Sequence, residues 1–258
     1  MNAAWVEGFA EGTVYGSLYA VAPAERDAAA DRFVATGLPI HIDVILDRDA
    51  SGTGPALSGS LVHRGIDPDA LLRLGERHPD SLLEVHLIVI GGAGGAAAAA
   101  ETVLRDEVAR VLSIAGRIGV QRVALPAHLA ADTSLTDEFR ADGGDVWAVV
   151  EPDDALHELD ALSAPSGSGA ITGALVMLIE PGTSQAARPE LLDRVAELAE
   201  LAPALHVSVD GGVDVAIATR AIELGVHHVI VGRALFPGLA DGETAQPEIA
   251  RFEYARSE

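Results

Sequence analysis

One short stretch of the sequence carries an imidazole and a carboxylate where an apolar strand would not need them. His41 and Asp43 are two residues apart, so in a β-strand both side chains project from the same face. Ile40, Ile42 and Val44 would occupy the opposite face and pack against helices. By itself the pair fits two interpretations equally well: a buried histidine–aspartate hydrogen bond, or two polar groups that face a common site.

His86 and Asp210 extend this pattern to two further segments, each at the end of an apolar or alternating run. Alone, an inward-facing histidine is most often a satisfied core residue, and an aspartate before two glycines often caps the next helix. Two imidazoles and two carboxylates that converge cannot all be buried without a partner. A divalent cation is such a partner, and nitrogen and oxygen ligands suit one ion of zinc, iron(II), manganese or cobalt.

Two carboxylates that come from different strands could also act on a substrate from opposite sides. Asp43 and Asp210 would then remove a proton from one face of a carbon and return one to the other face. A carboxylate is a poor base for a carbon acid unless the neighbouring carbonyl is polarised, so the bases need a metal ion that stabilises the enediolate. The pattern therefore suits metal-dependent inversion at a carbon, with Asp43 and Asp210 as the candidate catalytic residues.

The elements that would position these residues alternate between strand and helix along the chain. The predicted strands are Thr13–Ala20, Pro39–Leu46, Ser81–Ile88, Gln121–Pro126, Asp145–Val150, Ala170–Ile179, Leu205–Asp210 and His227–Val231. Apolar residues at three- and four-residue spacing predict the helices Ala24–Ala35, Asp69–Arg77, Ala96–Arg117, Leu135–Arg140, Ala155–Leu162, Pro189–Leu201 and Val213–Leu224. Eight strands that alternate with helices predict an α/β protein with a (β/α)8 TIM barrel, in which the carboxyl ends of the strands carry the site.

An open doubly wound sheet is the alternative architecture, but its glycine-rich first turn is missing after the first predicted strand. The run Gly91-Gly92-Ala93-Gly94-Gly95 resembles a phosphate loop, yet it lacks the lysine and the Ser/Thr of that motif, and we interpret it as a flexible connection. No Pro- or Ser-rich linker divides the chain. We therefore expect residues 1–258 to form a single barrel domain with a polar C-terminal extension after about residue 238.

Composition excludes several classes of function. The chain has 258 residues, of which 39 are acidic and 17 basic, and its formal net charge is −22. This acidity argues against nucleic acid or an anionic membrane as a partner. Every basic residue is an arginine, so no mechanism can use a Schiff-base lysine. Because the sequence also lacks cysteine, a signal-peptide pattern and a long apolar run, we expect a soluble cytoplasmic protein.

A second group of residues follows the later predicted strands and could bind phosphate. Gly182, Gly211, Gly212 and Gly232 lie in the loops where phosphorylated ligands commonly bind in barrels. Glycine lets a backbone N–H approach an anion closely, and Arg233 could add a bidentate contact. Taken singly, each glycine is also explained by a tight turn, and Arg233 by a solvated position at a helix start.

Taken in order, these motifs resemble the ribulose-phosphate 3-epimerase family. The matching pieces are Gly16-Ser17-Leu18, His41-Ile42-Asp43-Val44, Val85-His86-Leu87, Leu175-Val176-Met177 with Glu180-Pro181-Gly182, Val209-Asp210-Gly211-Gly212-Val213, and Val231-Gly232-Arg233-Ala234-Leu235-Phe236. The resemblance implies a (β/α)8 barrel of carbohydrate metabolism that interconverts ribulose 5-phosphate and xylulose 5-phosphate, in the pentose phosphate pathway, with one bound divalent metal ion.

The resemblance also implies roles for individual residues. It implies metal ligands at His41, Asp43, His86 and Asp210, with the two aspartates as the acid/base pair. It further implies a substrate contact at Ser17 and a phosphate site lined by Gly182, Gly211, Gly212 and Gly232.

The segments that would contact substrate depart from the family pattern. The run Ile45-Leu46-Asp47-Arg48 stands where the family has Met-Asp-Gly, and Ile88 replaces a methionine. Thr183-Ser184 replaces a glycine-rich loop, Arg233 replaces a serine, and Ala20 a polar residue. The expected ligand is therefore a small-molecule sugar phosphate that need not be ribulose 5-phosphate.

Two other functions stay open. One is a barrel that binds a phosphorylated metabolite without turnover, which the altered loops motivate. The other is a phosphate-binding-barrel lyase or decarboxylase, against which the missing lysine counts. Because barrels of this type often associate, we expect a homo-oligomer.

Overall fold

Eight parallel strands close into a barrel within residues 5, 8–48, 61–91, 98–156, 171–183 and 185–236, the part of the chain that the computed structural model describes. The parallel strands are β1 (Val14–Ser17), β2 (Ile40–Asp47), β4 (Leu83–Ile90), β5 (Arg122–Pro126), β6 (Asp145–Val150), β7 (Gly173–Met177), β8 (His206–Asp210) and β9 (His228–Val231). Strand β1 pairs with both β2 and β9, which closes the ring. The short strand β3 (Val62–His63) pairs antiparallel with the end of β2.

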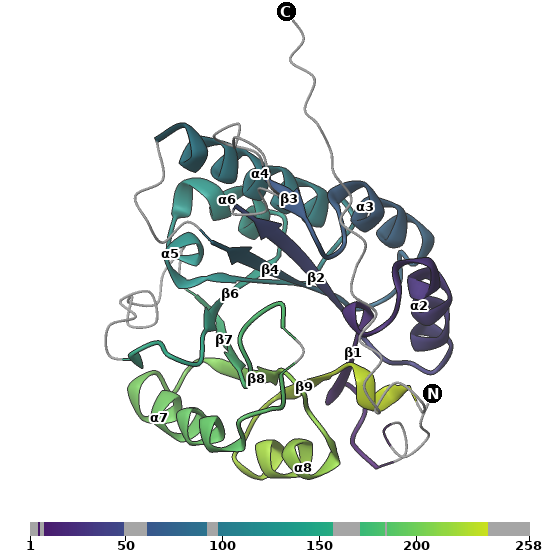
Figure 1. Cartoon of the computed structure of the whole chain (residues 1–258), viewed down its shortest axis with the longest axis vertical. Helices are drawn as coiled ribbons and strands as arrows, with labels where there is room; N and C mark the ends of the chain where they lie inside the picture. Colours follow the sequence, from purple (N-terminus) through teal and green to yellow (C-terminus); the bar gives the residue numbers. More distant parts are fainter. Residues whose placement is uncertain are drawn as a thin grey trace, which may run out of the picture.

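Helices cover the outside of this ring (Figure 1). They are α2 (Arg26–Ala35), α3 (Pro68–Arg77), α4 (Ala98–Arg117), α5 (Ala127–Ala130), α6 (Thr133–Ala141), α7 (Asp193–Leu201) and α8 (Val215–Glu223), with short 3-10 turns at Leu18–Ala20, Pro23–Glu25, Pro189–Leu192 and Arg233–Leu235. Side-chain caps fix several helix starts: Asp67 accepts a hydrogen bond from the N–H of Ala70, and Asp214 accepts one from Ile217. No helix among the described residues has both the length and the apolar character that crossing a membrane requires.

Alternation along the strands creates two separate cores. Outward-facing side chains such as Ile40 and Ile42 are fully buried in the layer between strands and helices. Inward-facing side chains, among them Trp147 and Leu175, pack together inside the barrel. Gly173 is required there, because a Cβ at this position would lie 2.3 Å from an atom of the Trp147 ring. Apolar side chains thus fill one layer of the barrel interior. The polar side chains of β2, β4 and β8 occupy a different layer.

The predicted TIM-barrel fold is confirmed, and each of the eight predicted strands corresponds to an observed parallel strand. The first was predicted too long: β1 ends at Ser17, and Leu18–Ala20 form a 3-10 turn that Ser17 caps by accepting a hydrogen bond from the N–H of Tyr19. Strand β3 and helix α5 were not predicted. Most of the predicted helix Ala155–Leu162, residues 92–95 of the glycine run and the C-terminal extension lie outside the described residues.

Candidate metal centre

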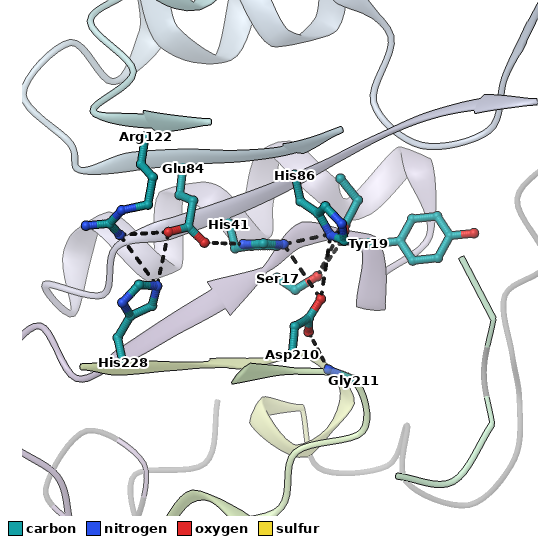
Figure 2. Close-up of polar contacts among 10 residues, drawn as sticks. Ser17, Tyr19, His41, Glu84, His86, Arg122, Asp210, Gly211 and His228 are labelled. Atoms are coloured by element: carbon teal, nitrogen blue, oxygen red, sulfur yellow. Dashed lines mark hydrogen bonds and ion pairs between the residues drawn. The ribbon is translucent and has the colours of Figure 1, made fainter. Parts of the chain in front are cut away.

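Three strands bring the four predicted site residues together inside the barrel. In the β2–β4 register Asp43 lies beside His86, and β8 contributes Asp210. The Nε2 atom of His41 lies 3.4 Å from Asp43 Oδ1 and 3.9 Å from Asp210 Oδ2. The Nδ1 atom of His86 lies 3.3 Å and 3.8 Å from the same two oxygens. One ligand atom from each of these four residues, which we call the cluster, lies within 4.8 Å of the others. Figure 2 shows His41, His86 and Asp210 directed toward one another.

The donor set fits a divalent cation. His41 Nε2 and His86 Nδ1 are buried and have no hydrogen-bond partner, so each presents a nitrogen to the cluster without a protein acceptor or donor. Ligand bonds of about 2.0–2.2 Å place two ligands of one ion roughly 3–4.3 Å apart, a range close to the observed separations. Two carboxylates and two imidazoles also match the charge and ligand preferences of a divalent transition metal.

Each carboxylate is held by one oxygen and turns the other toward the histidines. Ser17 Oγ donates a hydrogen bond of 3.1 Å to Asp43 Oδ2, so Ser17 lies against the cluster. The N–H of Gly211 donates a 2.7 Å bond to Asp210 Oδ1. Asp214, and not Asp210, caps α8, so the helix-cap explanation of Asp210 is wrong. The orientation of both carboxylates is thus fixed by the protein itself.

The two carboxylates differ in pKa although they face the same nitrogens. Burial opposes ionisation of Asp43, but the charges of His41 and His86 outweigh it and hold its pKa below the ordinary range. Burial raises the pKa of Asp210 to about 6. The charge of His41 lowers this pKa, and the charge of Asp43 raises it further. In the metal-free protein Asp43 is therefore the stronger acid of the two.

The residues predicted to bind phosphate lie in the loops after β7, β8 and β9. Gly182, Gly211 and Gly212 have φ values of +74°, +106° and +67°, a backbone region that other residues rarely adopt. Gly232 lies next to the cluster, since a Cβ there would be 3.8 Å from the Cβ of Ser17. Arg233 reaches back to the β7 loop, where its NH2 group donates to the carbonyl oxygen of Gln185 at 3.4 Å.

Three inward-facing charged or ionisable residues beneath the cluster were not predicted. Glu84, Arg122 and His228 come from β4, β5 and β9 and contact one another on the side of His41 that faces away from Asp210 (Figure 2). The sequence held a signal for one of them, because Glu84 is two residues before His86 and therefore shares its face. Arg122 and His228 begin their strands, where a polar side chain gives no such indication.

Comparison with protein families gives one match to this chain. The model of the ribulose-phosphate 3 epimerase family matches residues 129–236. The resemblance to this family is confirmed over that segment. The segment includes Asp210 and the loops after β7, β8 and β9, whereas the other three clustered residues precede it, so their place in the site depends on the geometry. No curated protein sequence matches the chain.

Several solved structures of enzymes resemble this one in fold. A mutant tryptophan synthase α-subunit from Pyrococcus furiosus is 13% identical with a TM-score of 0.54, and the match covers 88% of this chain and 89% of that one. The tryptophan synthase α-subunit from Campylobacter jejuni is 13% identical with a TM-score of 0.54, and the match covers 94% of each chain. Phosphoribosyl anthranilate isomerase from Thermus thermophilus is 13% identical with a TM-score of 0.50, and the match covers 88% of this chain and 90% of that one. At such identities the likeness shows the (β/α)8 fold alone.

Proposed function

We propose that the protein is a metal-dependent epimerase that inverts C3 of a phosphorylated ketose, namely ribulose 5-phosphate/xylulose 5-phosphate or a related sugar phosphate. The observation that carries the proposal is the meeting of two unpartnered imidazole nitrogens with two carboxylates from different strands. The family match over residues 129–236 supports an epimerase rather than another barrel chemistry.

In this proposal His41, Asp43, His86 and Asp210 hold the divalent ion. When bound, the ion would polarise the substrate carbonyl and stabilise the negative charge that develops as the C3 proton leaves. Asp43 and Asp210 belong to β2 and β8, which β1 and β9 separate in the ring. They would approach C3 from different sides, so one takes the proton from one face and the other delivers a proton to the opposite face.

The phosphate group would bind at the loops after β7, β8 and β9. Gly212 and Gly232 would offer backbone N–H groups, and Arg233 a guanidinium. The N–H of Gly211 already donates to Asp210, so Gly211 would line the site without donating to the phosphate. The β7 loop also carries Glu180, whose carboxylate lies 3.7 Å from the guanidinium of Arg188. Because Thr183 and Arg233 depart from the family pattern in these loops, we propose phosphorylated ketoses as a class.

A deuterium-uptake screen tests this function. Phosphorylated ketopentoses and ketohexoses are incubated with the protein in D₂O, with and without a chelator, and C3 is followed by NMR. We expect one ketose to exchange its C3 proton and to yield its epimer, and the chelator to stop both. Exchange at no substrate would contradict the proposal. In that case tight binding alone would favour a metabolite-binding barrel, and cleavage or CO₂ release would favour a lyase or decarboxylase.

A further inference from the structure

Glu84 is a carboxylate sealed inside the barrel directly beneath the cluster. Its exposed fraction is 1%, and its partners come from three different strands. Oε1 lies 2.8 Å from Nδ1 of His41, while Oε2 accepts a 2.7 Å hydrogen bond from NH1 of Arg122 and lies 3.0 Å from Nε2 of His228. Oε2 is thus anchored to Arg122 and His228, and Oε1 is directed at His41, a residue of the proposed metal centre.

The surroundings hold this carboxylate in place. The guanidinium of Arg122 lies over the Trp147 ring, with its central carbon 4.1 Å from the ring centroid. The ring of His228 lies 4.2 Å from that of Tyr15, and 5.5 Å from that of Trp147. Both groups that anchor Oε2 therefore lie against aromatic rings. Because an unpaired buried charge is costly, each member of this network depends on the others.

A carboxylate only accepts hydrogen bonds, so the contact with Glu84 requires that Nδ1 of His41 carry the proton. In the neutral ring that a metal ligand must be, Nε2 then has a free lone pair, and it is this atom that faces Asp43 and Asp210. His86 presents the other nitrogen, Nδ1, to the same point. The two histidines therefore need opposite tautomers. Glu84 selects the tautomer of His41 by accepting the hydrogen bond from Nδ1–H.

We propose that Glu84 is a positioning residue that fixes the tautomer and ring orientation of His41, so that Nε2 is presented as a metal ligand. The inference rests on the proposed metal centre but not on the identity of the substrate. A carboxylate behind a metal-binding histidine raises the basicity of the ligand and restricts its rotation, and removing such a partner typically weakens metal binding about 10- to 100-fold.

Metal affinity tests this role without any enzymatic assay. Zn²⁺ and Co²⁺ are titrated into the metal-free protein in competition with a chromophoric chelator, for wild type, Glu84→Gln and Glu107→Gln. Glu107 is a matched control, because it is also largely buried and pairs with a histidine and an arginine, His63 and Arg110, away from the cluster. We expect Glu84→Gln to bind about 10- to 100-fold more weakly, with a changed Co²⁺ visible spectrum, and Glu107→Gln to bind as wild type does.

Equal affinity in wild type and Glu84→Gln would overturn the role of Glu84 and leave the metal centre standing. If wild type binds neither ion, both the metal centre and this inference fail. A measurement on wild type alone decides the matter even if Glu84→Gln does not fold: two-bond ¹H–¹⁵N NMR of the Zn²⁺-loaded protein identifies which nitrogen of His41 carries hydrogen. Hydrogen on Nδ1 supports the proposal, and hydrogen on Nε2 overturns it.

Discussion

Asp43 and Asp210 face the same pair of histidine nitrogens from different strands, each with its second oxygen bound by the protein at 3.1 Å or less. The donor is a side chain, Ser17, in one case and a backbone N–H, that of Gly211, in the other. Neither carboxylate can therefore turn away from the cluster without losing a hydrogen bond. The two similar groups therefore keep separate orientations.

The first prediction concerns these two carboxylates. If each serves one face of C3, Asp43→Asn and Asp210→Asn should each slow solvent deuterium uptake by about 100- to 10,000-fold, and each should affect uptake from a different epimer most strongly. NMR of both epimers in D₂O, with metal content measured in parallel, checks this. Ser208→Ala is the control, because Ser208 is two residues before Asp210 on the same face and its buried hydroxyl has no partner. Uptake at the wild-type rate in both aspartate variants would exclude the two-base mechanism.

The second prediction concerns metal and stability. A ligand that binds only the folded state at 100 times its Kd adds about 2.7 kcal/mol of stability. For a chain of this size that corresponds to a rise in Tm of about 5–10 °C. We expect such a rise on adding Zn²⁺ or Mn²⁺ to the metal-free protein, and little rise in His86→Gln. His206→Gln, at the exposed start of β8, should respond as wild type does. Differential scanning calorimetry at fixed pH measures the shifts, and an equal shift in His86→Gln would remove that residue from the site.

Much of the fold and of the candidate site could be predicted because the alternation of inward- and outward-facing side chains along each strand is visible in the sequence. His41 and Asp43, and equally Glu84 and His86, share a face through their two-residue spacing, whatever the rest of the chain does. This alternation does not show which strands are neighbours in the barrel. Arg122 and His228 each begin a strand, where a polar residue normally faces solvent, and only closure of the ring brings them to Glu84.

The missed elements have similar physical causes. Strand β3 has two residues, Val62 and His63, which is too short for any periodicity to appear. The shortening of β1 depends on the Ser17 hydroxyl, which caps a 3-10 turn where the apolar pattern continues through Leu18. Local hydrogen bonds of a single side chain therefore override a pattern that is summed over several residues.

The third prediction concerns the phosphate end. If Arg233 binds the phosphate group, Arg233→Gln should raise KM for the phosphorylated ketose about tenfold, which corresponds to about 1.4 kcal/mol, while metal affinity stays unchanged. Arg220→Gln controls for the loss of a positive charge, because Arg220 is exposed on α8 and pairs with Glu223. Steady-state kinetics with the substrate found in the deuterium screen measures both. An unchanged KM in Arg233→Gln would show that Arg233 does not contact the phosphate.

The fourth prediction concerns the pH dependence of stability. A hydrogen bond from His63, helped by the charge of Arg110 and opposed by burial, lowers the pKa of Glu107 below its ordinary value of 4.5. Because the folded pKa lies below the unfolded one, the stabilisation is present above about pH 4.5 and is lost as the pH falls through the folded value. Urea unfolding should therefore show Glu107→Gln to be about 1 kcal/mol less stable than wild type at pH 7, with the difference shrinking below pH 4.5. The exposed Glu138→Gln controls for net charge. A difference between Glu107→Gln and wild type that stays constant down to pH 3 would mean that the carboxylate charge contributes nothing at this pair.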